Sequence, residues 1–196
     1  MASPFSVPGA KLTLVVALAM TMLGFIGISG SISALTSNVD ELVRPDPSAP
    51  AEVAEAGEAF LRAFLTSPLR RAMNVANLLA SGLLLIASFL LTGRSRSAPW
   101  WAAQALWANA IYSLGAGAIN VYLVQAYRLE LLELVHAILA AQAAQGEPVP
   151  TEGADGLPLL IVAFTIFMHA VFAGLYVLLL RVTRREDVRR FVAREV

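Results

Sequence analysis

"LPLLIVAFTIFMHAVFAGLYVLLLR", residues 157–181, contains no Asp, Glu, Lys or Arg before its last position. A helix needs about 20 apolar residues to cross the roughly 30 Å hydrocarbon core of a bilayer, so this stretch predicts a membrane span over 157–180. The composition agrees, because 58% of the 196 residues are hydrophobic and 14% are charged, whereas about 25% are charged in typical soluble domains. The sequence therefore predicts an integral membrane protein.

Three further stretches have the same character. Residues 12–34, 72–92 and 100–126 contain no charged residue, and each is long enough to cross a bilayer as a helix. We expect an all-α fold, namely a four-helix (tetraspan) membrane bundle that forms a single membrane domain over 1–196. The connections 35–71 and 127–156 are long enough to add helical extensions outside the membrane.

The first stretch has an alternative interpretation. Lys11 before an apolar run, with the small residues of "SGSISA" at 29–34, also fits a secretory signal. The apolar run is longer than the 7–15 residues typical of a signal core, which favours a true span.

The distribution of Lys and Arg predicts the orientation. The 93–99 turn and the 181–196 tail hold eight Arg and lie on the side of Lys11, whereas the two long connections with Arg70 and Arg71 hold five. Basic residues are in excess on the cytoplasmic side of membrane proteins. We therefore expect both termini in the cytoplasm, both long connections outside, and localisation in a cytoplasmic (inner) membrane.

Both long connections contain helical patterns. Residues 51–66 are amphipathic, with Val53, Phe60 and Phe64 on one face, and their acidic character favours packing on protein over packing on lipid. From Tyr127 to Gln145 the helical pattern continues without Gly or Pro, so one helix is expected to run from 99 to 145. The two patterns are expected to pack together as a helical cap.

Two spans carry aligned polar side chains. At about 100° per residue, each set below falls within about 60° of its helix circumference. The set in span two is Asn74, Asn77, Ser81 and Ser88, and the set in span three is Asn109, Ser113 and Asn120. Spans two and three are joined by a short turn, so we expect the two stripes to face each other. Small and amide side chains hold membrane helices together, which favours a structural seam over a polar pathway.

Span one contributes glycines and span four a titratable side chain. Gly24, Gly27 and Gly30 would allow a neighbouring helix to approach closely. His169 lies at the centre of span four, with Thr165 and Tyr176 on the same face. A histidine within the membrane is a candidate functional site, but a neutral, hydrogen-bonded imidazole is the favoured interpretation.

The sequence indicates no catalytic, metal or cofactor site. Cysteine is absent and the net charge is zero, which excludes thiolate chemistry and gives no reason to expect nucleic-acid binding. The acids at Glu147, Glu152 and Asp155 lack the spacing of a calcium-binding loop.

The basic tail gives the clearest indication of partners. Anionic lipid headgroups attract a basic residue near the surface by about 1 kcal/mol. The tail residues expected to feel this attraction are Arg181, Arg184, Arg185, Arg189 and Arg190. Protein partners or self-association are expected as well.

No motif points to a known family. We expect a non-enzymatic accessory or scaffold subunit of a membrane complex or homo-oligomer. Two alternatives remain: a small channel or transporter component that uses the Asn/Ser stripes, and a haem carrier that uses His169.

Overall fold

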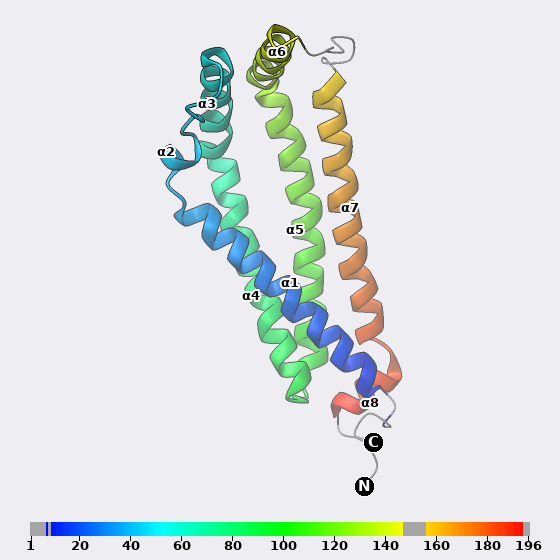
Figure 1. Cartoon of the computed structure of the whole chain (residues 1–196). Helices are drawn as coiled ribbons and strands as arrows, with labels where there is room; N and C mark the ends of the chain where they lie inside the picture. Colours follow the sequence, from blue (N-terminus) through cyan, green and yellow to red (C-terminus); the bar gives the residue numbers. More distant parts are fainter. Residues whose placement is uncertain (1–6, 8, 147–155, 194–196) are drawn as a thin grey trace. The chain divides into compact units, whose positions relative to one another are not determined.

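The computed structural model describes residues 7, 9–146 and 156–193, which form helices joined by turns and loops, with no strand among them (Figure 1). The four long helices are α1 (Ala10–Thr36), α4 (Pro68–Thr92), α5 (Ala98–Ala126) and α7 (Leu157–Thr183). The shorter helices are α2 (Val39–Leu42), α3 (Ala51–Thr66), α6 (Arg128–Ala144) and α8 (Glu186–Ala193). The expected all-helical character is confirmed.

Three of the described helices are long and apolar enough to cross a membrane: α1, α4 and α7. They indicate an integral membrane protein. The segment predicted as span three lies within the 29-residue helix α5, which is not among these three. A four-span bundle therefore stays a prediction.

The chain divides into two compact units by its internal packing. The first unit contains residues 1–35, 73–115 and 169–196, and the second contains 36–72 and 116–168. The helices α4, α5 and α7 each contribute residues to both units, and each unit is described by itself.

In the first unit, α1 crosses α4 obliquely (Figure 1). A side-chain carbon at Gly27 would lie 2.0 Å from Ser81 Oγ, and one at Gly24 would lie 3.1 Å from the Ser81 carbonyl oxygen. At Gly30, no described residue beyond the neighbouring turns of α1 itself comes within 4 Å of such a position. Two of the three glycines therefore allow the close approach of α4, as small residues do between membrane helices.

Around this crossing, apolar side chains from five helices form the core of the first unit. They are Val16, Ala17, Met20, Leu84, Ala87, Leu91, Ala98, Ala102, Ala105, Leu106, Leu179, Leu180 and Val192. The contribution of α5 is mainly alanine, which lets neighbouring backbones come close.

The short helix α8 is fixed against two other segments of this unit. Arg94, in the 93–97 turn, donates from Nε to the Phe191 carbonyl at 2.8 Å, and its guanidinium lies 4.3 Å from the centre of the Phe191 ring. Gly9 has φ +82°, and a side-chain carbon there would lie 2.2 Å from the Asp187 carbonyl oxygen. The start of α1, the 93–97 turn and the basic tail therefore meet.

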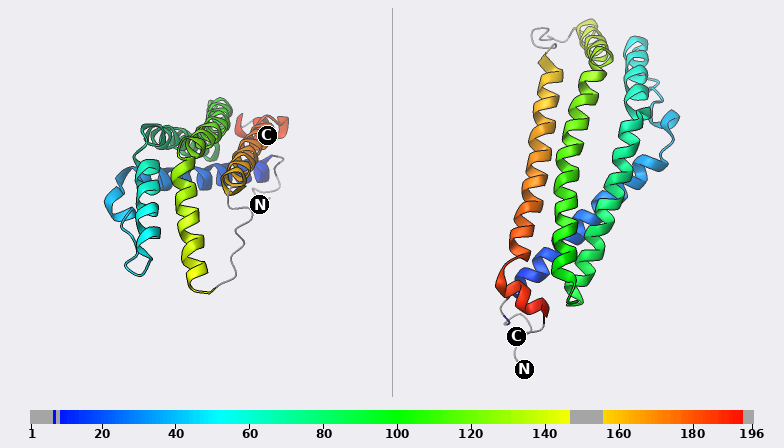
Figure 2. Two further views of the ribbon diagram at one scale, coloured as in Figure 1. Left: turned by 90° about the horizontal axis from the view of Figure 1, so that it is seen from above. Right: turned by 180° about the vertical axis from the view of Figure 1, so that it is seen from behind.

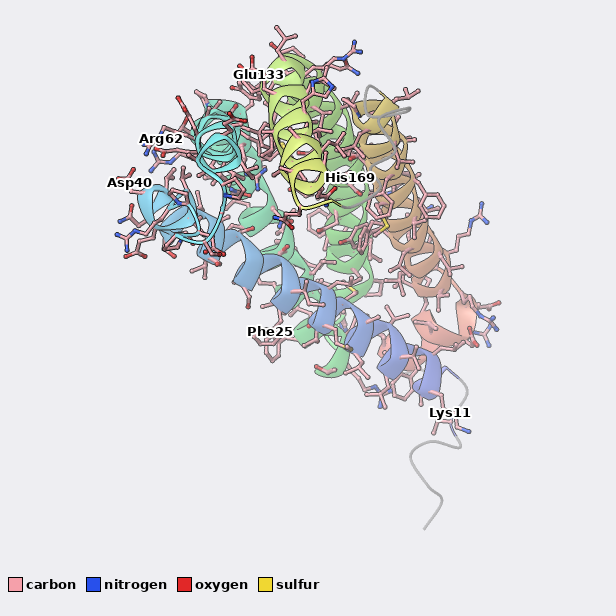
Figure 3. All side chains as sticks on the ribbon, turned by 45° about the horizontal axis from the view of Figure 1, so that its top comes forward. Lys11, Phe25, Asp40, Arg62, Glu133 and His169 are labelled. Carbon is pink, nitrogen blue, oxygen red and sulfur yellow. The ribbon has the colours of Figure 1, made fainter. Side chains whose placement is uncertain are left out.

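In the second unit, α3 packs against α6, and Figure 2 (left) shows the two side by side. Phe60 contributes to a small core with Val124, Leu131 and Val162, which confirms the expected packing of the 51–66 helix on protein. On the exposed side of α3, Arg62 donates to Glu58 one helical turn away at 3.1 Å and to Asp40 at 3.0 Å (Figure 3).

The expectation of one helix from 99 to 145 is wrong. The helix α5 ends at Ala126, Tyr127 adopts φ −106° and ψ 28°, and α6 then leaves in a different direction (Figure 2). The Tyr127 ring lies edge-on to Phe64 of α3, with ring centres 6.5 Å apart. The helix therefore breaks where Tyr127 packs against α3, although the sequence has no Gly or Pro at this position.

Candidate functional site

The polar stripe of α4 bonds to α1. The Asn77 amide nitrogen donates to Ser31 Oγ at 3.0 Å and to the Gly27 carbonyl at 3.3 Å, and its oxygen accepts from Ser81 Oγ at 3.4 Å. Thr21 Oγ1 donates to Ser88 Oγ at 3.0 Å. The glycine contact and these bonds form one continuous seam between α1 and α4, which we call the α1–α4 seam.

The stripe of α5 bonds to the backbones of its neighbours. Asn109 is 1% exposed and donates its amide to the Ala80 carbonyl of α4 and to the Ala105 carbonyl of its own helix, both at 2.8 Å. Ser113 Oγ donates to the His169 carbonyl of α7 at 3.0 Å. These two side chains hold α5 to the helices on either side of it.

The expected face-to-face arrangement of the two stripes is therefore not what the hydrogen bonds show. The α4 stripe is bonded to α1, and the α5 stripe reaches backbone carbonyls of α4 and α7. Asn74 is half-buried, and Asn120 is half-buried within the second unit.

Sequence reasoning missed Thr21 and Ser31 as seam residues. Both lie with Gly24 and Gly27 within about 120° of the α1 circumference at 100° per residue. Their position on the same side of α1 as these two glycines is the sequence signal that could have identified them as seam residues.

His169 is half-buried on α7, where Figure 3 labels it. Its backbone carbonyl accepts the Ser113 bond. Tyr176 is half-buried and packs against the core of the first unit, and Thr165 is half-buried in the second. The role of the imidazole stays a prediction.

A groove with a volume of about 1120 Å³ opens beside α8, at the end of the first unit where α5 starts and α7 stops. Its lining combines guanidinium groups with apolar side chains. The lining residues are Arg96, Pro99, Trp100, Ala103, Thr183, Arg184, Glu186, Arg189, Arg190 and Ala193. We call it the tail groove, and sequence reasoning missed it because it joins segments far apart in the chain.

Carboxylates on α8 offset part of the basic charge near the tail groove. Arg190 pairs with Glu186 one helical turn away. Arg185 donates from Nε to Asp187 at 3.2 Å, and this hydrogen bond holds the pKa of the Asp187 carboxyl below its usual value. In the described part of the chain, Arg96, Arg184 and Arg189 form no ion pair.

Among the described residues, no group of three or more His, Asp or Glu side chains is arranged to hold a metal ion. The acids Glu147, Glu152 and Asp155 lie outside the described residues.

Comparisons of the chain with protein-family models, with curated proteins and with solved structures find no match.

Proposed function

We propose that the protein is a non-enzymatic accessory or scaffold subunit of a membrane complex or homo-oligomer. In this proposal the chain crosses a cytoplasmic (inner) membrane four times through α1, α4, α5 and α7. Both termini then lie in the cytoplasm, because the 93–97 turn and the tail carry the excess of Arg.

The observation that carries the proposal is how the polar side chains of the helices are used. Asn77, Ser88, Asn109 and Ser113 all bond to a neighbouring helix. A polar pathway needs such groups turned towards water, whereas here they join helices to one another. The stripes therefore support a structural role.

The exposed apolar faces of α1 and α7 support the binding of a partner. The most apolar stretch of α7 is 11% buried by the rest of the chain, and Phe25 on α1 points away from the packed helices (Figure 3). Lipid covers such faces in a membrane, and a partner helix or second copy fits the same chemistry.

The test is the mass of the protein after mild extraction. The full chain would be released from its membrane in polymer-bounded discs, purified and measured by native mass spectrometry. The proposal expects a mass above that of one chain, from further copies or a stoichiometric partner. A purely monomeric particle would overturn it.

Two alternatives have their own signatures. Flux of ions or small solutes through liposomes that contain the purified chain would favour the channel or transporter component. A Soret absorption band that His169→Ala removes would favour the haem carrier. Either result would replace the scaffold proposal.

A further inference from the structure

We infer that the tail groove binds the phosphate of an anionic phospholipid, with Arg96, Arg184 and Arg189 around the headgroup and Trp100 beside its apolar part. The inference rests on the proposed function in one respect: the chain must cross the membrane so that α8 and the start of α5 lie at its cytoplasmic surface. It narrows the attraction of the tail for anionic lipid, which the sequence predicts, to a single site.

The charge of the tail groove fits a phosphate. Its lining holds four guanidiniums and one carboxylate, a net charge of 4 − 1 = +3. Glu186 is paired with Arg190. Within the described residues the three other guanidiniums of the lining form no ion pair, so they are available to a ligand. Arg is suited to phosphate because its planar fork donates two parallel hydrogen bonds.

The residues that α5 contributes to the lining of the tail groove are apolar. Pro99, Trp100 and Ala103 lie on the first turns of α5, and Trp100 is 59% exposed. Tryptophan is enriched where membrane meets water, since its ring is amphipathic. A ligand with a charged head beside a glycerol and acyl portion matches both the guanidiniums and the apolar residues of the lining, whereas a free phosphate matches only the guanidiniums.

The tail groove is also held in shape before any ligand arrives. Val188 and Val192 bury the apolar side of α8, and Arg94 fixes Phe191 to the 93–97 turn. Arg189 is therefore presented from a docked helix and Arg184 from the turn just before it, so binding a ligand requires little further ordering of the groove.

The experiment measures lipid retained by the purified full chain. Protein in detergent is mixed with phosphatidylglycerol or phosphatidylcholine, and bound lipid is counted and titrated by native mass spectrometry. Arg184→Gln/Arg189→Gln removes two groove guanidiniums. The matched control, Arg181→Gln/Arg185→Gln, removes the same charge from the same segment but outside the groove lining.

We expect saturable phosphatidylglycerol binding that the groove variant weakens by about tenfold or more, since a charge-assisted hydrogen bond contributes about one such factor. The control should stay within about twofold of the parent. If both variants weaken phosphatidylglycerol binding equally, the tail groove is not the binding site, and only a general attraction of the tail for anionic lipid remains. If the protein does not prefer phosphatidylglycerol over phosphatidylcholine, both the binding site in the groove and the general attraction for anionic lipid are wrong.

Inorganic phosphate separates the two sources of the ligand group. We expect phosphate to compete weakly with phosphatidylglycerol, and Trp100→Ala to weaken the lipid while leaving phosphate binding unchanged. If phosphate alone binds as tightly as the lipid, and Trp100→Ala affects neither, the assignment to a phospholipid is wrong.

Discussion

Gly27 of α1 faces Ser81 of α4 so closely that any side-chain carbon at position 27 would lie 2.0 Å from the serine hydroxyl and 2.9 Å from its Cβ. The contact to Cβ means that rotation of the hydroxyl alone cannot relieve the overlap. The helices would have to separate, and the bonds from Asn77 to α1 would lengthen with them.

Gly27→Ala is therefore expected to destabilise the protein by about 1–3 kcal/mol, the usual cost of overpacking. Gly30→Ala is the matched control, since that position is open and alanine gains up to about 1 kcal/mol of helix propensity over glycine. Unfolding in mixed micelles, followed by circular dichroism, would measure both. Equal stabilities would show that α1 and α4 do not meet at Gly27.

The polar side chains between helices are expected to be dry. The chain contains no cysteine, so single cysteines are clean probes of water access. Ser88→Cys and Ser113→Cys replace buried hydroxyls and should react with a charged thiol reagent only after denaturation. Ser97→Cys, at an exposed position in the turn, should react at once. Rapid labelling of position 113 in the folded protein would instead support a water-filled path.

Arg94 is expected to hold α8 in place. Arg94→Gln removes both the bond to the Phe191 carbonyl and the contact with its ring. A cation–π contact and a charged hydrogen bond together contribute about 1–2 kcal/mol or more. Hydrogen exchange at Val192 should therefore become about tenfold or more faster. Arg96→Gln should leave this exchange rate unchanged, and an equal effect of both changes would contradict the assigned role.

Apolar packing, more than ion pairing, is expected to stabilise the second unit. Phe60→Ala should destabilise the second unit by at least about 1 kcal/mol, whereas Leu61→Ala, at a more exposed neighbouring position, should have a smaller effect. Asp40→Asn should change little, because exposed ion pairs contribute little. Thermal unfolding followed by hydrogen exchange in residues 128–144 would compare the stabilities of the three variants. A larger loss of stability in Asp40→Asn than in Phe60→Ala would contradict this prediction.

Sequence reasoning predicted what depends on local pattern. The amphipathic helix over 51–66 follows from the periodicity of its apolar residues. The structure has α3 over those residues.

Sequence reasoning could not predict features that depend on how each helix is rotated about its axis or on contacts between residues far apart in the chain. A helical wheel places Asn77 and Ser88 on one side of α4, but it does not say whether α1 or α5 occupies that side. The break at Tyr127 has no local signal, since it goes with the packing of Phe64 on another helix. The tail groove needs Arg96 and Arg189 together, and no spacing rule relates them.

The contact between Gly9 and the Asp187 carbonyl has a consequence for biogenesis. Gly9 precedes α1, whereas Asp187 follows α7, which is synthesised after α1, α4 and α5. The contact at Gly9 therefore cannot form until the start of α8 has been synthesised. Although chains begin to fold from the N-terminal side during synthesis, this end of the first unit must close last, which makes a stalled chain that ends before α8 a natural target for quality-control proteases.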